Sequence, residues 1–183
     1  AATANFGEDL IFQEKELTAG KRFLIKLFNA SKFSLMHLKD FDNKKVKLEL
    51  IDKWLLLRLN KLIKEVIEDY NSYRISLAKQ KIENFFWHVF CDNYLEIIKD
   101  RLYNEKKRGK EKRKSAQYTL DFTLSSLIKL IAPIMPHITE EIYQNYFVKK
   151  EKIKSIHINK FPSFDKKLID LINKKYNLKF FSL

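Results

Sequence analysis

The stretch KQKIENFFWHVFCDNYLEIIKDRLY, residues 79–103, is where we expect the rest of this chain to pack. Its apolar residues recur at steps of three and four: Ile82, Phe85, Phe86, Val89, Phe90, Tyr94, Ile97, Ile98 and Leu102. This spacing predicts an amphipathic helix with a wide aromatic face, and Ser76 is expected to cap its amino end. Because such a face needs apolar partners on several sides, we expect this helix to be the central member of a helical bundle.

The composition favours the same architecture. The chain has 183 residues, of which 45% are hydrophobic and 14% aromatic, so it can bury a sizeable core. It contains only 3 glycines and 3 prolines, which suits long helices better than the many tight turns of a β-sandwich. We therefore predict an all-α fold, a bundle of about four to five main helices with a small C-terminal appendage.

Two helices are expected before the central one. The first covers residues 15–38, and its inward residues are expected to be Leu17, Leu24, Leu27, Phe28, Ser31 and Leu35. The second covers residues 48–69, with inward residues Ile51, Leu55, Leu59, Leu62, Ile63 and Val66.

The segments after the central helix are expected to finish the bundle and form the appendage. Residues 117–131 have helical spacing, and Pro136 can open a short helix that reaches Tyr146. The alternation of Ser155–Ile158 fits a short extended segment, and apolar residues from Leu168 to Ile172 mark a last short helix. The expected domains are a connector (1–14), a helical bundle (15–148) and an appendage (149–183).

The charge balance favours a polyanionic partner. There are 36 Lys and Arg residues against 23 Asp and Glu residues, a formal net charge of +13. Such an excess is typical of proteins that bind nucleic acid, although a genome that favours Lys codons would also produce it. The densest basic run is Lys106, Lys107, Arg108, Lys110, Lys112, Arg113 and Lys114. We expect it to be a mobile basic loop that attracts RNA backbone without sequence preference.

Neither a metal centre nor a catalytic centre is indicated. His88, Cys91 and Asp92 share a helical face, but the spacing of the other histidines supplies no fourth ligand, so we interpret this group as part of the core. As the single cysteine, Cys91 cannot form an internal disulfide, which fits a reducing compartment. No apolar run reaches the roughly 18 residues of a spanning helix, and we expect a soluble cytoplasmic chain. The opening sequence from Ala1, without Met, reads as part of a longer protein.

Cations and an aromatic ring lie together on the first predicted helix. Lys15, Lys26, Lys32 and Phe33 could neutralise phosphates and stack an unpaired base, which are the two contacts that single-stranded RNA needs. By pattern alone, a solvated lysine face with Phe33 in the core is the favoured interpretation, since surface lysines on helices are common.

Four motifs, in order, resemble the anticodon-binding domain of valyl-tRNA synthetases, and together they cover about residues 5–160. They are Lys26-Leu27-Phe28-Asn29-Ala30 with Lys32-Phe33, Asp52-Lys53-Trp54 with Arg58-Leu59-Asn60, Phe85-Phe86-Trp87 with Phe90-Cys91-Asp92 and Tyr94-Leu95-Glu96, and Pro133-Ile134-Met135-Pro136 with Ile138-Thr139-Glu140-Glu141. The proline motif also fits the isoleucyl and leucyl enzymes, whereas the Phe-Phe-Trp motif points to the valine enzyme.

The resemblance implies a function in tRNA recognition rather than in catalysis. The catalytic domain, which uses ATP, and the editing domain of the family lie outside this region, so no catalytic site and no cofactor are expected in it, and the chain is expected to be a monomer. By resemblance, Lys26, Lys32 and Phe33 contact the anticodon loop of valine tRNA, and Lys15 occupies a position where an Arg also serves. Lys32 stands where the family has Arg, which keeps the charge but loses planar stacking and bidentate hydrogen bonding.

Two other functions are considered beside tRNA binding. A freestanding helical scaffold would bind another protein through the aromatic face of residues 79–103 and would show a large exposed apolar patch. A small hydrolase would use Cys91 and His88, and it would need an exposed thiol with a low pKa.

Overall fold

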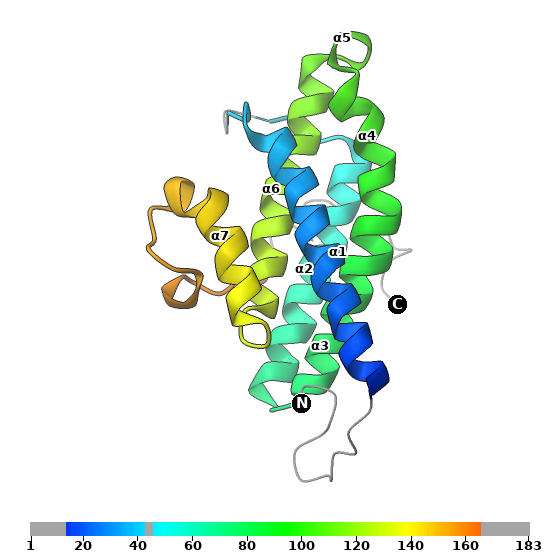
Figure 1. Ribbon diagram of the computed structural model, residues 1–183. Helices are drawn as coiled ribbons and strands as arrows, with labels where there is room; N and C mark the ends of the chain where they lie inside the picture. The colour runs from blue at the N-terminus through cyan, green and yellow to red at the C-terminus, as the bar shows by residue number, and fades with distance from the viewer. Residues whose placement is uncertain (1–13, 43–45, 166–183) are drawn as a thin grey trace.

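The computed structural model describes residues 14–42 and 46–165. The elements are α1 (Glu14–Leu38), α2 (Leu50–Asn71), α3 (Ile75–Asn84), η1 (Phe85–Leu95), α4 (Glu96–Tyr103), α5 (Glu105–Arg108), α6 (Lys110–Ile131), α7 (Pro136–Glu151) and η2 (Ile156–Ile158). Within these two ranges there is no strand, and the predicted all-α bundle is confirmed (Figure 1). None of the helices in them is both long and apolar enough to cross a membrane.

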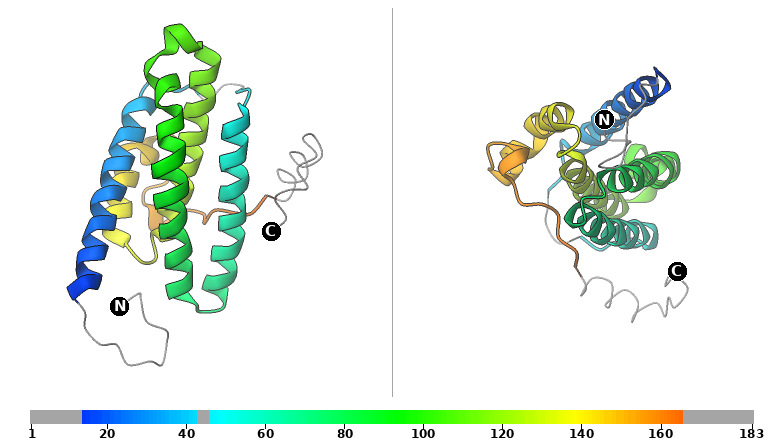
Figure 2. Two further views of the ribbon diagram at one scale, coloured as in Figure 1. Left: turned by 90° about the vertical axis from the view of Figure 1, so that its right-hand side faces the viewer. Right: turned by 90° about the horizontal axis from the view of Figure 1, so that it is seen from below.

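α3, η1 and α4 follow one another without a break and form one long rod (Figure 2). Its middle part, η1, is a π-helix, in which backbone hydrogen bonds span five residues. The predicted aromatic face is the buried face of this rod, since Phe85, Phe86, Phe90 and Tyr94 are each at most 5% exposed. The ring of Phe86 packs edge-on against Phe23 of α1, with 5.3 Å between the centroids. A scaffold that bound a partner through these rings is therefore excluded.

The central position in the bundle belongs to α6 rather than to the rod. α6 contacts each of the other α-helices of the described residues, whereas the rod contacts α1, α2, α5 and α6 and makes no extensive contact with α7. The buried side chains of α6 include many small ones, which let neighbours approach from several directions: Ser115, Ala116, Thr119, Thr123 and Ser126. The rod is one-sided, with His88, Asp92 and Glu96 exposed. The prediction that residues 79–103 form the central member was therefore wrong.

α1 confirms the helix predicted over residues 15–38 but buries a different face. The buried residues of α1 are Phe23, Leu27, Ala30, Ser31, Ser34, His37 and Leu38. Leu17, Leu24 and Phe28 were expected inside, yet they are 63%, 38% and 42% exposed. The helix carries two apolar stripes about 100° apart. Packing against α6, α7 and the rod buries the stripe that contains Phe23 and leaves the other one at the surface.

The connection from α2 to α3 is a tight turn. Tyr73 adopts a left-handed conformation (φ 57°), and α3 then begins at Ile75 with Arg74 in the N-cap position. The prediction that Ser76 caps this helix was wrong, because the helix starts one residue before it. The guanidinium of Arg74 pairs with the buried carboxylate of Asp69 at 2.8 Å and stabilises the turn.

The buried carboxylate of Asp52 ties α2 to the rod and to α6. It accepts two hydrogen bonds from the guanidinium of Arg101, at 2.8 and 2.9 Å, and one from the hydroxyl of Tyr94 at 2.7 Å. Ser115 of α6 donates a further hydrogen bond. Because Asp52 is fully buried, this complete set of donors is what makes its charge tolerable inside the bundle.

The basic run over residues 106–114 is helical and not a loop. It forms α5 and the first turn of α6, which are separated by Gly109 in a conformation (φ 94°) that favours glycine. Several of its cations are neutralised by ion pairs: Arg108 with Asp100, Arg113 with Asp40 and Glu105, and Lys114 with Asp42. The prediction of a mobile loop was wrong because the fold brings these carboxylates to the run.

The C-terminal part of the described chain folds back over α7. As predicted, α7 begins at Pro136, but it continues to Glu151, so the domain boundary expected at residue 149 falls inside a helix. The segment expected to be extended forms the short helix η2 instead, and its Ile156 backbone N–H donates to Glu140 at 3.0 Å. Residues 1–13 of the predicted connector (1–14) and the last helix after residue 165 lie outside the described residues, and Glu14 is the first residue of α1.

Candidate nucleic-acid interface

α1 presents three of the four predicted anticodon-binding residues on one face. Lys15, Lys26 and Phe33 are separated by eleven and seven residues, which places them within about 20° of one another around the helix and over a length of about 27 Å. Lys32 is rotated by about 100° from Phe33 and belongs to the neighbouring face. Lys15 and Lys32 are exposed, whereas Lys26 and Phe33 are half-buried.

Lys26 lies in the seam between α1 and η1. Its Nζ is 3.2 Å from Oδ1 of Asp92 and 5.0 Å from the centre of the Trp87 ring, an arrangement that combines an ion pair with a cation–π contact. The other carboxylate oxygen of Asp92 is 3.3 Å from Nδ1 of His88. The side chains of Lys26 and Asp92 remain 38% and 43% exposed, so a ligand can reach both.

Phe33 lies in the seam between α1 and α4, within a group of three rings. Its ring packs edge-on against His37 at 4.8 Å and lies 6.4 Å from Tyr103, the last residue of α4. His37 in turn packs edge-on against Tyr103 at 4.7 Å. His37 is 7% exposed and Tyr103 is 60% exposed, so the group extends from the core to the surface. Phe33 is thus neither a simple core residue nor a fully exposed one.

α6 holds the end of α1 that carries this aromatic group. The side-chain amide of Gln117 donates to the backbone carbonyl of His37 at 2.7 Å and to Asp40 at 2.9 Å. The Arg113 guanidinium also pairs with Asp40 and, at 2.9 Å, with Glu105. Its hydrogen bond holds the pKa of the Asp40 carboxyl below the ordinary value, while burial and the nearby guanidinium of Arg113 lower the pKa of His37. His37 therefore stays neutral near pH 7.

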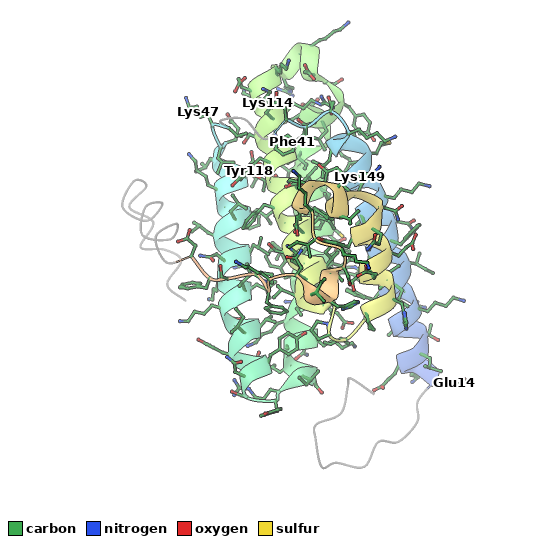
Figure 3. The ribbon with its side chains drawn as sticks, turned by 90° about the vertical axis from the view of Figure 1, so that its left-hand side faces the viewer. Glu14, Phe41, Lys47, Lys114, Tyr118 and Lys149 are labelled. Atoms are coloured by element: carbon green, nitrogen blue, oxygen red, sulfur yellow. The ribbon has the colours of Figure 1, made fainter. Side chains whose placement is uncertain are left out.

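The cations of α5 and the start of α6 gather at one end of the bundle, which we call the basic cap. Lys106, Lys107, Lys110 and Lys112 are exposed there. Lys114 lies at this end as well, and Glu14, the first residue of α1, lies at the opposite end (Figure 3). The C-terminal end of α1, with Phe33, is therefore the part of the helix nearest the basic cap.

Cys91 has the properties of a core residue. It is 5% exposed, and burial raises the pKa of its thiol to about 12. The core interpretation is confirmed for Cys91 but was wrong for His88 and Asp92, which are exposed and paired with each other. A hydrolase that uses this thiol as nucleophile is contradicted, because the thiol is neither accessible nor ionised at neutral pH.

Four residues at these seams were not predicted from the sequence as parts of the site: Trp87, Asp92, His37 and Tyr103. Trp87, Asp92 and Tyr103 come from the rod and follow the end of α1 at Leu38 by 49, 54 and 65 residues in the sequence. His37 is on α1 itself, one turn after Phe33, and this spacing of four was the only local signal for any of them.

Comparison with known proteins identifies the family. Residues 52–182 match the anticodon-binding domain of tRNA ligases, so the match also includes the tail that the four motifs did not cover. The chain is 41% identical over 172 residues to valine–tRNA ligase of Pyrococcus furiosus, which covers 92% of this chain and 19% of that protein. It is 42% identical over 166 residues to the Ehrlichia canis enzyme, an alignment that covers 90% of this chain and 20% of that enzyme. It is 34% identical over 174 residues to the Archaeoglobus fulgidus enzyme, an alignment that covers 93% of this chain and 19% of that enzyme.

The chain thus spans about a fifth of the length of these valine–tRNA ligases. The family match begins at Asp52, after α1. The Pyrococcus alignment, however, leaves out less than a tenth of the chain, fewer residues than α1 contains, and therefore includes part of this helix. With its all-α bundle and its match over most of its length, the chain belongs to the family of anticodon-binding domains of tRNA ligases.

Proposed function

We propose that this chain binds the anticodon loop of valine tRNA through α1 and the two seams that α1 makes with the rod. The observation that carries the proposal is the alignment of Lys15, Lys26 and Phe33 on one face of α1 in a member of an anticodon-binding family. The similarity to valine–tRNA ligases supports valine as the amino acid.

The two seams provide different chemistry for unpaired nucleotides. At the α1–α4 seam, Phe33 offers a ring whose orientation is fixed by His37, and an unstacked base can stack on it. At the α1–η1 seam, the cation of Lys26 lies beside the carboxylate of Asp92, so the local net charge is small. Such a donor and acceptor pair suits the edge of a base better than a phosphate. Valine anticodons end in A-C, and these two bases are the ones to be read.

Phosphate attraction is assigned to the exposed cations. Lys15 and Lys32 on α1 and the exposed lysines of the basic cap are available to the RNA backbone. Arg113 is mostly buried, with a side chain 17% exposed, and is engaged by two carboxylates. We propose that Arg113 holds α1 in place rather than contacting RNA.

The longer protein would place this domain beside the parts that perform catalysis. We propose a monomeric cytoplasmic valine–tRNA ligase in which a catalytic domain uses ATP and an editing domain removes wrong products. The exposed stripe of Leu17, Leu24 and Phe28 lies about 140–180° around α1 from Lys26 and Phe33. If the other domains pack against this apolar stripe, the basic face of α1 stays free for tRNA.

The test is fluorescence anisotropy of this chain with valine tRNA and with a copy whose A-C anticodon bases are replaced, each over a salt series. Base recognition predicts a preference for the native tRNA that persists as salt rises, because counterion release affects both RNAs equally. Equal binding that disappears with salt would contradict the proposal and leave a basic bundle without anticodon recognition.

A paired substitution on α1 tests the assignment of Phe33. Phe33→Ala should weaken binding of native valine tRNA by about 1–3 kcal/mol, the usual loss when a stacking ring is removed. Phe28→Ala is the matched control, since Phe28 is on the same helix and 42% exposed but faces away from the seams. If the two variants bind alike, or if Phe33→Ala weakens both tRNAs equally, Phe33 is not a base-reading residue.

A further inference from the structure

We infer that Tyr103 is a second base-stacking residue of this interface and takes the nucleotide next to the one on Phe33. The inference rests on the proposed function and extends it to a residue that no motif indicated. Tyr103 lies at the carboxyl end of α4, across the seam from α1.

The first argument is exposure. The Tyr103 side chain is 60% exposed, and no hydrogen bond from its hydroxyl to another described residue is seen, so most of the ring is free to contact a ligand. Its ring is nevertheless oriented, because it stands at 88° to the His37 ring at 4.7 Å. An exposed ring that is held by an edge contact is a suitable platform for a base, because little conformational freedom is lost on binding.

The second argument is the distance between the two rings. The centroids of Phe33 and Tyr103 are 6.4 Å apart and the ring planes are tilted by 55°. This is about twice the 3.4 Å rise per nucleotide of a stacked strand. One base cannot stack flat on both rings, and two neighbouring bases can use them only if they are splayed apart, as single-stranded RNA bases are when proteins read them.

The third argument is a buried polar atom in the same group of rings. Nε2 of His37 is buried and has no hydrogen-bond partner among the described residues. A buried polar atom without a partner is costly, and because the His37 ring touches both Phe33 and Tyr103, nucleotides on these rings would bring hydroxyl and base atoms close to it. His37 is neutral near pH 7, so either a donor or an acceptor would serve.

The fourth argument is continuity with the basic cap. Lys106 and Lys107 follow Tyr103 by three and four residues, and both are exposed. Phosphates on either side of a base on Tyr103 would therefore meet cations. Tyr103 thus lies between the α1–α4 seam and the basic cap, so one RNA strand can contact both.

The experiment compares Tyr103→Ala, Tyr103→Phe and Tyr73→Ala for binding of native valine tRNA by anisotropy. Tyr73 is the matched control because it is 77% exposed and lies in the turn between α2 and α3, at the opposite end of the bundle from α5 (Figure 1). Tyr103→Ala should weaken binding about 5- to 150-fold, whereas Tyr103→Phe, which keeps the ring, and Tyr73→Ala should stay within about twofold of the unaltered chain. Thermal melts of all three variants check that the bundle is intact.

A set of valine tRNAs, each with one abasic nucleotide in the anticodon loop, identifies the base. One member of the set should bind the unaltered chain and Tyr103→Ala equally, because the stacking partner is already missing. Native-like affinity of Tyr103→Ala, or the same loss against every abasic tRNA, would overturn the inference. If the unaltered chain shows no preference for the native anticodon, the proposed function itself fails, which is a separate outcome.

Discussion

Two of the ion pairs that join the rod to its neighbours differ in almost every physical respect. The pair between Arg101 and Asp52 lies between α4 and α2, with side chains 11% and 0% exposed and two hydrogen bonds of 2.8 and 2.9 Å. The pair between Lys26 and Asp92 lies between α1 and η1, has one contact of 3.2 Å, and leaves both side chains more than a third exposed.

The comparison shows which charges stabilise the fold and which are available to a ligand. Asp52 has its hydrogen bonds completed inside the protein by Arg101, Tyr94 and Ser115, so removing Arg101 leaves a buried charge unpaired, and removing either hydroxyl leaves that charge with one hydrogen bond fewer. The contact between Lys26 and Asp92 is solvated, and such pairs contribute little to stability. A net charge of +13 therefore says less about the RNA site than the burial of each charge does.

The largest expected effect is on the buried pair. Asp52→Ala should lower the free energy of unfolding by about 3–5 kcal/mol, because Arg101 is then left largely buried without a counter-charge. Urea unfolding followed by circular dichroism measures this loss. The matched variant Asp92→Ala should cost less than about 1 kcal/mol. Similar losses for the two variants would show that the difference in burial has no energetic consequence.

A smaller effect on stability is expected when the positive charge of Arg101 is kept and the shape of its side chain is changed. Arg101→Lys should lower the free energy of unfolding by about 1.5–3 kcal/mol, because an ammonium cannot reproduce the two parallel hydrogen bonds of the guanidinium. Arg74→Lys is the control, since Arg74 also pairs with a buried aspartate, Asp69, but its own side chain is 56% exposed. A control variant as destabilised as Arg101→Lys would contradict the role of burial.

Much of the fold could be predicted from the sequence because helical spacing is a local property. The ranges of α1 and α2 and the start of α7 at Pro136 agree with the predictions to within two residues. The buried face of α1 could not be predicted, because the helix has two apolar stripes and only its neighbours decide between them. The helical basic run was also missed, since the carboxylates that neutralise it, such as Asp40 and Asp100, come from elsewhere in the fold.

The site could be predicted only as far as α1. Resemblance named Lys15, Lys26, Lys32 and Phe33, and helix geometry places three of them on one face. Their assignment as anticodon contacts stays a prediction. Trp87, Asp92 and Tyr103 could not be found in this way, because they meet α1 only through tertiary packing of the rod. A single sequence thus indicates the residues on one side of a seam, and only the structure shows which residues lie on the other side.

The smallest expected effect is on the binding of valine tRNA when a member of the exposed pair, Lys26 or Asp92, is changed. If the carboxylate of Asp92 only opposes the RNA backbone, then Lys26→Ala should weaken binding of valine tRNA and Asp92→Asn should strengthen it, each by about 1 kcal/mol or less. The slope of the logarithm of the binding constant against the logarithm of the salt concentration should change by less than roughly 0.7, which is the change that one lost phosphate contact produces.

The sign for Asp92→Asn separates two functions of the exposed pair. Weaker binding, confined to the native anticodon, would mean that the carboxylate accepts a hydrogen bond from a base, as carboxylates do from the amino group of cytosine. Stronger binding to native and altered tRNA alike would mean that Asp92 only partly neutralises the charge of Lys26. Because both side chains are solvated, neither variant should change the free energy of unfolding by more than about 1 kcal/mol, so either sign reports on RNA binding rather than on folding.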